Sequence, residues 1–238
     1  MTPIRAGDSD SCVADDRAFW DQLIRERGSR AFDTYESDES VAKARQEIDH
    51  LLLSRIDGVA RGRILEIGCG RGRMTQVLAD HFASVVALDI SREATRRCRA
   101  TVAASNVLVL LGDDRTVAAM PSQSFDVVFS YAVFQHISSR SALRSYIGSA
   151  ARIVNAGGVA LLQLRQPGWK ARIVDFLAFA RRSASHRTWS RSWRGHVLPE
   201  SEIRRAALAA CPGATVSTFL DAFVAGVPRH LWVEIRPG

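Results

Sequence analysis

The sequence has few of the residues that stabilise small secreted domains or hold zinc. Its 238 residues include four cysteines, which lie far apart, without C-x-x-C spacing and without clustered histidines. They are Cys12, Cys69, Cys98 and Cys211. This spacing argues against a disulfide framework and against a metal site, and it fits a reducing compartment.

Long apolar runs are also missing. No stretch approaches the ~20 residues that a membrane-spanning helix needs. Residues 1–16 are polar and acidic, and they lack the basic-then-apolar order of a signal peptide. We therefore expect a soluble, cytoplasmic protein without a transmembrane segment. The hydrophobic content of 47% is enough for the core of one α/β domain.

Lysine is scarce, and the positive charge is confined to one segment. The net charge is +7, although Lys43 and Lys170 are the only lysines. Residues 165–198 contain eight bases against one acid, Asp175, so this segment carries the whole excess and the remainder is neutral. The basic character therefore belongs to an insertion, and the rest of the fold does not require it.

Short apolar runs alternate with segments of helical periodicity along the chain. Strands are expected at 63–67, 84–88, 106–111, 125–131, 159–165, 215–219 and 230–235. This alternation predicts a Rossmann-like, doubly wound α/β sheet of seven strands, mostly parallel. The last two strands have no helical pattern between them, which predicts an antiparallel C-terminal hairpin.

We expect two parts in the chain. Residues 1–60 read as an N-terminal helical cap that begins with a short helix at 16–28, and Trp20 and Tyr35 belong to this lid over the site. Residues 61–238 form the main domain, with a basic, aromatic insertion at 166–198.

The segment Leu65–Gly72 dominates the first half of this main domain. An apolar run turns into glycines at every second position, which predicts a strand, a tight turn and a helix start. Open α/β sheets bind ligands at such turns. A dinucleotide-binding loop needs a third glycine where this chain has Arg73, and a P-loop needs Lys-Ser/Thr where it has Arg73-Met74. Both nucleotide-phosphate interpretations lack a required part.

Several further motifs follow in a fixed order. Glu66 precedes the G-x-G-x-G loop, and the second strand ends in Asp89. The other motifs are Gly112-Asp113, the strand Ser124–Ser130 and the helix end Arg152–Gly158. Together, over about Arg61 to Gln163, they resemble the class I S-adenosylmethionine-dependent methyltransferases. The pattern is most similar to the small-molecule branch, of the methyltransferase type 11/25 kind.

This resemblance implies S-adenosylmethionine as the cofactor, and it implies roles for individual residues. Asp89 accepts both ribose hydroxyls with its two oxygens, Asp113 accepts from the adenine amino group, and Ile90 packs on the adenine. Glu66 helps to hold the loop and the amino-acid end. The other cofactor-binding residues are expected to be Gly68, Cys69, Gly70, Gly72, Asp114, Ser130 and Tyr131.

His136 is the candidate general base if the acceptor is a hydroxyl. It follows the fourth strand, and the ordinary imidazole pKa of about 6.5 suits proton transfer near neutral pH. The alternative is a histidine at a helix start that orders the pocket without taking part in the reaction. The substrate-contacting residues are expected to be Tyr35, Phe134, Trp169 and Arg172.

Three interpretations of the 166–198 insertion remain open. It is a lid helix with solvated arginines, a site whose arginines recognise an anionic group on the acceptor, or a basic amphipathic helix that contacts a membrane or a lipid-like acceptor. Bases among aromatics also suit nucleic acid. However, Ser130–Val133 is not the Asn/Asp-Pro-Pro-aromatic element of amino-methylating DNA enzymes, so nucleic acid is the less favoured partner.

The main hypothesis is therefore a small-molecule methyltransferase, O-directed rather than N-directed, of a natural-product or sugar pathway in secondary metabolism. The competing hypothesis is a cofactor-binding protein without transferase activity. The sequence does not indicate an oligomeric state.

Overall fold

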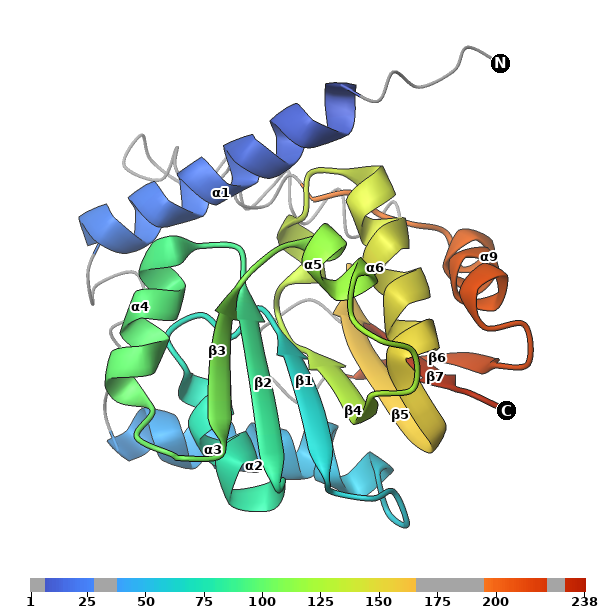
Figure 1. Cartoon of the computed structure of the whole chain (residues 1–238), viewed down its shortest axis with the longest axis horizontal. Coiled ribbons are helices and arrows are strands. Elements are labelled where there is room, and N and C mark those ends of the chain that lie inside the picture. Colours follow the sequence, from blue (N-terminus) through green and yellow to red (C-terminus); the bar gives the residue numbers. More distant parts are fainter. Residues whose placement is uncertain (1–6, 28–37, 166–194, 222–229) are drawn as a thin grey trace.

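The fold is a seven-stranded mixed sheet with helices on both faces (Figure 1). The computed structural model describes residues 7–27, 38–165, 195–221 and 230–238. The strands are β1 (Arg63–Ile67), β2 (Ser84–Asp89), β3 (Val107–Leu111), β4 (Phe125–Ser130), β5 (Val154–Leu164), β6 (Thr215–Asp221) and β7 (His230–Arg236). Their order is β3-β2-β1-β4-β5-β7-β6. Strands β1 to β5 pair in parallel, whereas β7 is antiparallel to β5 and β6. The predicted sheet and its C-terminal hairpin are confirmed.

The helices connect these strands and cover the two faces. They are α1 (Gly7–Arg27), α2 (Asp38–Leu51), α3 (Arg73–His81), α4 (Arg92–Thr101), α5 (Asp114–Ala118), α6 (Arg140–Ile153) and α9 (Glu200–Ala210), with short 3-10 turns η2 (Leu53–Arg55) and η3 (Phe134–His136). Among the residues that the structure describes, no helix is long and apolar enough to cross a membrane.

The central strands are buried on both faces, which explains why their sequences are continuous apolar runs. On one face, Ile64, Val85 and Val127 pack with α2 and α3, and Ala87 packs with α4. On the other face, alternate residues such as Leu65 pack with α5, α6 and α9. Two separate cores therefore fix the strands from both sides.

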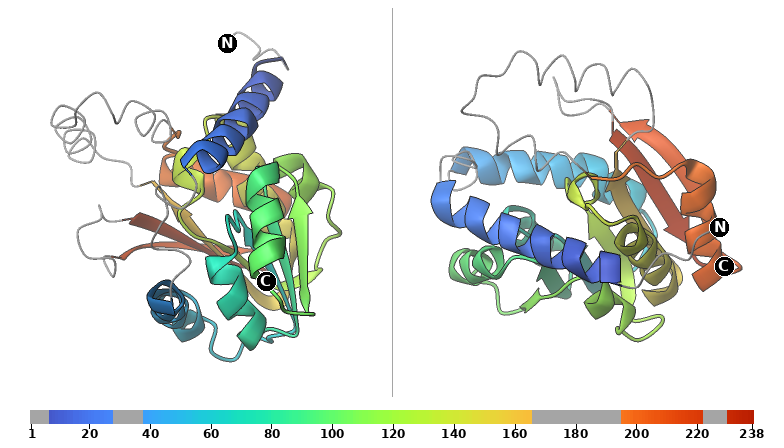
Figure 2. Two further views of the ribbon diagram at one scale, coloured as in Figure 1. Left: turned by 90° about the vertical axis from the view of Figure 1, so that its left-hand side faces the viewer. Right: turned by 90° about the horizontal axis from the view of Figure 1, so that it is seen from above.

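Helix α1 belongs to neither layer and lies across the carboxyl ends of the strands (Figures 1 and 2). It begins at Gly7, nine residues before the predicted start at Asp16. The early residues are Gly, Asp and Ser, which have low intrinsic helix propensity, so the sequence pattern concealed them. The inward face of α1 extends back to Val13, three residues before the predicted start.

Strand β5 also begins earlier than predicted, at Val154 and not at Val159. Phe125 pairs with Val154 but Val127 already pairs with Val159, so the ladder contains an irregularity. Gly157, with φ of 77°, lies in the extra residues. The glycines predicted to form a turn before the strand therefore form a bulge inside it.

Gly72 is the N-cap of α3 and has φ of 93°. A Cβ atom at this position would lie 2.6 Å from Cγ2 of Val102 and 2.9 Å from Sγ of Cys98. Both neighbours are buried, Cys98 within α4 and Val102 at its end. The absence of a side chain is therefore what lets the start of α3 pack against the end of α4.

We expect Gly72→Ala to lower the free energy of unfolding by about 2 to 5 kcal/mol, because left-handed strain and overpacking add. Gly58→Ala is the matched control, since Gly58 has φ of 75° but no atom within 4 Å of its Cβ position. It should cost only about 1 to 2 kcal/mol. Urea unfolding of both variants gives these values, and equal losses would contradict the packing argument.

Candidate active site

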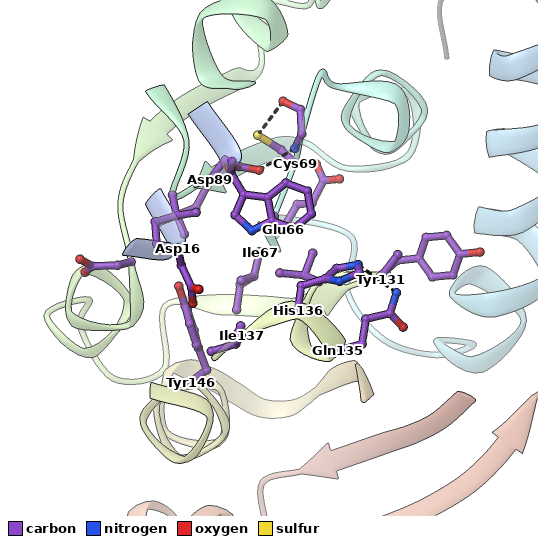
Figure 3. A pocket seen from close by; sticks show the side chains of 18 of the residues that line it. Asp16, Glu66, Ile67, Cys69, Asp89, Tyr131, Gln135, His136, Ile137 and Tyr146 are labelled. Carbon is purple, nitrogen blue, oxygen red and sulfur yellow. Dashed lines mark hydrogen bonds between the residues drawn. The ribbon is translucent and has the colours of Figure 1, made fainter. Parts of the chain in front are cut away.

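A cavity of about 360 Å³ opens at the carboxyl ends of β1, β2 and β4 (Figure 3). Its wall combines α1, the glycine loop, the end of β2, the turn before α5 and the connection between β4 and α6. Apolar surface dominates, with a few carboxylates, one imidazole and two guanidinium groups. This volume and composition are those of a small-molecule site in an open α/β sheet.

The glycine loop is bound directly to the end of β2. Both Gly68 and Cys69 donate their backbone N–H groups to the Leu88 carbonyl, at 2.6 and 3.0 Å. Gly68 has φ of 83°, and a Cβ atom there would lie 2.1 Å from the Val133 side chain. The loop can therefore approach both β2 and the β4–α6 connection only with glycine at this position.

The side chain of Asp89 also binds the glycine loop. One carboxylate oxygen accepts from the Gly70 N–H at 2.8 Å, and the other accepts from the Ser91 N–H at 2.9 Å. Burial raises the pKa of Asp89, and these backbone hydrogen bonds lower it again in part. Because each carboxylate oxygen has two acceptor sites, Asp89 can also accept from two hydroxyl donors in the cavity.

Glu66 is the second carboxylate on the cavity wall, and it is 3% exposed. It accepts a hydrogen bond from the Thr75 hydroxyl at 2.6 Å. Burial raises the pKa of Glu66 to about 7, although the bond from Thr75 lowers it. A carboxyl group in this state favours a cationic ligand beside it, since a cation would compensate the lost hydration.

Asp113 and Asp114 line the cavity at the start of α5, and Ile90 lines it beyond β2. Asp113 caps α5, because one of its oxygens accepts from the N–H groups of Arg115 and Thr116. Its other oxygen lies 3.4 Å from a guanidinium nitrogen of Arg17 on α1. Burial raises the pKa of Asp114.

His136 lies in η3 and faces the cavity (Figure 3). Its ring meets the Trp20 indole of α1 edge to face, with centroids 5.3 Å apart. Its Nε2 is 3.1 Å from the amide nitrogen of Gln135. Since an amide nitrogen can only donate, Nε2 accepts in this arrangement. Gln135, which the sequence did not indicate, therefore orients the imidazole.

Three predicted contacts do not reach the cavity. Ser130 is fully buried, and its hydroxyl donates to the Ile67 carbonyl at 3.0 Å, so it joins β4 to β1. Gly72 is buried at the start of α3. Phe134 is 1% exposed and packs on Tyr146 in the core. The other cofactor-binding candidates line the cavity: Glu66, Gly68, Cys69, Gly70, Asp89, Ile90, Asp113, Asp114 and Tyr131. The substrate candidates Tyr35, Trp169 and Arg172 lie outside the described residues.

The polar face of α1 makes contacts that the sequence did not reveal. Asp16 accepts from the Ser138 N–H at 3.1 Å, and Asp21 accepts from the Ser91 hydroxyl at 2.6 Å and the Glu93 N–H at 3.0 Å. The apolar lining residues of this helix are Val13, Trp20, Leu23 and Ile24. The helical spacing of these apolar residues could have predicted that they face inward. The contacts of Asp16 and Asp21 could not be predicted, because their partners lie far away in the sequence.

A second set of contacts that the sequence did not predict involves Glu47. Glu47 of α2 is 3% exposed, and it accepts from a guanidinium nitrogen of Arg73 at 2.5 Å and from the Tyr131 hydroxyl at 3.3 Å. Arg73 and Tyr131 both line the cavity. A buried acid on α2 thus holds two polar side chains of the wall.

The raised pKa of Glu66 predicts a specific pH dependence of stability. Its stabilising contribution is complete below the ordinary pKa of 4.5 and is lost as the pH rises through about 7. Relative to Glu66→Gln, the ligand-free protein should therefore lose about 3 kcal/mol of unfolding free energy between pH 4.5 and 8. Denaturant titrations across this range measure the difference. Parallel pH profiles for the two proteins would contradict the assignment.

Comparison with known proteins gives a family for the part of the chain that builds this site. Residues 65–162 match the family model described as a methyltransferase domain. The chain is 33% identical over 114 residues to ribosomal RNA small subunit methyltransferase C of Klebsiella pneumoniae, which covers 45% of this chain and 32% of that protein. It is 32% identical over 133 residues to ubiquinone biosynthesis O-methyltransferase of Pseudomonas aeruginosa, covering 52% and 54%.

These alignments span about a third to a half of the relatives' lengths. Among solved structures, magnesium protoporphyrin IX methyltransferase from Synechocystis PCC 6803 with bound SAH aligns with a TM-score of 0.66 at 13% identity. That alignment covers 93% of this chain and 99% of the other. The resemblance expected from the motifs is confirmed: residues 65–162 form a methyltransferase domain of the class I S-adenosylmethionine-dependent kind, within the fold of that class.

Proposed function

We propose that the protein transfers a methyl group from S-adenosylmethionine to the hydroxyl of a small-molecule acceptor. The observation that carries the proposal is the pair of carboxylates, the buried Glu66 and the partly buried Asp89, on the wall of one cavity beside a glycine loop. A P. aeruginosa relative named as an O-methyltransferase supports the choice of a hydroxyl.

The residues of the cavity fit this cofactor. It carries an adenosine, a sulfonium and an amino-acid end, and it has no phosphate. Asp89 offers acceptor sites for ribose hydroxyls, and the buried Glu66 favours the ammonium group. The loop lacks the Lys-Ser/Thr pair that a P-loop uses to bind a nucleotide di- or triphosphate. Asp113 and Ile90, to which the resemblance gives the adenine contacts, line the same cavity.

When bound, the cofactor supplies an electrophilic methyl group on its sulfonium. The protein then has to align the acceptor, exclude water and take up a proton. Helix α1 covers the cavity with apolar side chains, including Trp20 and Leu23, and so keeps water out. We assign proton uptake from the acceptor hydroxyl to His136, which Trp20 and Gln135 hold at the cavity wall. Since Nε2 carries the one ring lone pair in this arrangement, it must exchange the Gln135 amide for the acceptor hydroxyl before it takes up the proton.

Three alternatives remain distinct from this proposal. An amine acceptor would need no base of this strength, and a binding protein without transferase activity would keep Asp89 and Glu66 but turn over no acceptor. RNA is the third, because the K. pneumoniae relative is named for ribosomal RNA. We also propose that the protein is cytoplasmic, that the helical cap ends at residue 60, where the main domain begins, and that the 166–198 insertion contributes to the acceptor site.

We expect Asp89→Asn to weaken binding of S-adenosylhomocysteine by about tenfold or more, because a charged acceptor for the ribose hydroxyls is lost. Isothermal calorimetry measures this. Asp80→Asn is the control, since Asp80 is exposed and pairs with Arg45 away from the cavity. Unchanged binding in Asp89→Asn would refute the ribose assignment.

His136→Gln should lower kcat for a hydroxyl acceptor by about 10² to 10⁴-fold. The wild-type rate should also fall at acid pH, where an imidazole is protonated, and the variant should lack this acid limb. A methyl-transfer assay with S-adenosylmethionine and a panel of hydroxylated, aminated and anionic acceptors measures both quantities.

The control is His50→Gln, because His50 lies on the exposed side of α2 and pairs with Asp221. If His136→Gln retains full kcat at neutral pH, the histidine orders the pocket and is not the base. Turnover of RNA with no turnover of small molecules would replace the proposed acceptor class.

A further inference from the structure

The connection between β4 and α6, residues 131–139, carries the candidate base and forms a large part of the cavity wall (Figure 3). The base itself lies in η3, a turn of three residues, and the His136 N–H closes this turn by donating to the Val133 carbonyl at 2.9 Å. So short a turn gains too few hydrogen bonds to be stable by itself. Contacts from other segments therefore have to hold it in place.

The connection begins with an unusual backbone conformation at Ala132. Its φ is 60°, in the left-handed region that residues with a side chain rarely adopt. Such a conformation persists only where the surroundings hold it, and it is often found at functional sites. Here the contact comes from β5, because Oε1 of Gln163 accepts from the Ala132 N–H at 2.5 Å.

Gln163 is the one polar residue in the buried run 159–164 of β5. It is 3% exposed, and it is not among the described residues that line the cavity. A buried amide is costly unless it is hydrogen-bonded, so the Ala132 N–H gives a physical reason for glutamine in this strand. Since β5 pairs with β4, Gln163 reaches across to the end of the neighbouring strand and holds the first residues of the connection.

Gly195 holds the middle of the same connection. A Cβ atom on Gly195 would lie 2.1 Å from the carbonyl oxygen of Gln135 and 2.9 Å from the backbone nitrogen of His136. The φ of Gly195 is not in the left-handed region, so glycine is needed for the close approach and not for its conformational freedom. The next residue, His196, donates its N–H to the Ile137 carbonyl at 3.1 Å.

We propose that Gln163 and Gly195 are positioning residues for His136, and that they act through the backbone of the β4–α6 connection. This inference rests on the proposed function, because it takes His136 as the base. The imidazole has to keep its place while Nε2 exchanges the Gln135 amide for the acceptor hydroxyl, and small displacements of a reacting group cost much of the rate. Gln163 lies just before the 166–198 insertion and Gly195 near its end, so the two flanks of the insertion hold the segment that carries the base.

The first measurement follows the imidazole itself and needs no acceptor. In protein labelled with ¹³C in histidine, the ring Cε1–H signal of His136 is identified by its absence from His136→Gln. The Trp20 ring lies edge to face with centroids 5.3 Å apart, so this signal is sensitive to the place of the imidazole. We expect the signal to move in Gln163→Met, which has only a weak acceptor for the Ala132 N–H, and in Gly195→Ala.

The second measurement is methyl transfer from S-adenosylmethionine to the same panel of acceptors. Both variants should lower kcat by about 10- to 100-fold. Their affinity for S-adenosylhomocysteine in calorimetry should stay within about threefold of the wild-type value. A lower kcat with cofactor binding retained indicates a displaced catalytic group and not a general loss of structure. Gln163→Glu keeps an acceptor oxygen on a side chain of the same length, so it should retain most of the wild-type kcat.

Two matched controls change similar features away from the connection. Asn106→Leu corresponds to Gln163→Met, because Asn106 also bonds to the backbone, at two carbonyl groups near the end of α3, but at the amino-terminal end of the sheet. Gly213→Ala corresponds to Gly195→Ala, since no atom lies within 4 Å of its Cβ position. Neither control should move the His136 signal or lower kcat.

The inference is wrong if folded Gln163→Met or Gly195→Ala leaves the His136 signal in place, or keeps the wild-type kcat where His136→Gln loses it. If one of the two variants does not fold, the other still decides, because the two contacts come from different segments. Full kcat in His136→Gln would instead overturn the role of this histidine in the proposed function, so the two failures can be told apart.

Discussion

The site depends on the carboxylate of Asp89, which bridges the Gly70 and Ser91 N–H groups. This one side chain joins the end of β2 to the glycine loop and to the N-terminus of α4. The loop lies against β2 because Gly68 also donates to Leu88. The group that shapes the loop is therefore the group that faces the cavity, so the loop and the proposed ribose contact form together. Truncation of the Asp89 side chain would remove the loop contacts and the ribose contact together. Asp89→Asn keeps a side chain of the same size, so it is the more informative variant.

A second constraint is the closure of the cavity by α1. Its acids bind the backbone at the starts of α4 and α6, and its apolar residues face inward. Beneath it, burial raises the pKa of Glu66 and of Asp89 by desolvation. Low solvation makes each buried charge more sensitive to a ligand charge of opposite sign. The same helix thus supplies both the dry environment and, through Trp20, one contact of His136.

The sequence predicted the strands, the glycine loop and Asp89, because these depend on local periodicity and turn chemistry. The sequence did not predict features that depend on the direction of a side chain or on partners that are distant in the sequence. Ser130 and Tyr131 are adjacent on an extended chain, so their side chains point in opposite directions, and only Tyr131 reaches the cavity. Glu47 lies in α2, well before the glycine loop in the sequence. The residues around it do not indicate that it pairs with Arg73. The length of α1 was missed because its first residues have weak helix propensity.

The most direct test of the account is a crystal structure of the protein grown with S-adenosylhomocysteine. The account predicts the ligand in the cavity beneath α1, with both ribose hydroxyls within hydrogen-bond distance of Asp89 and the amino-acid end beside Glu66. A ligand bound elsewhere on the protein, or bound in this cavity with its ribose away from Asp89, would contradict it.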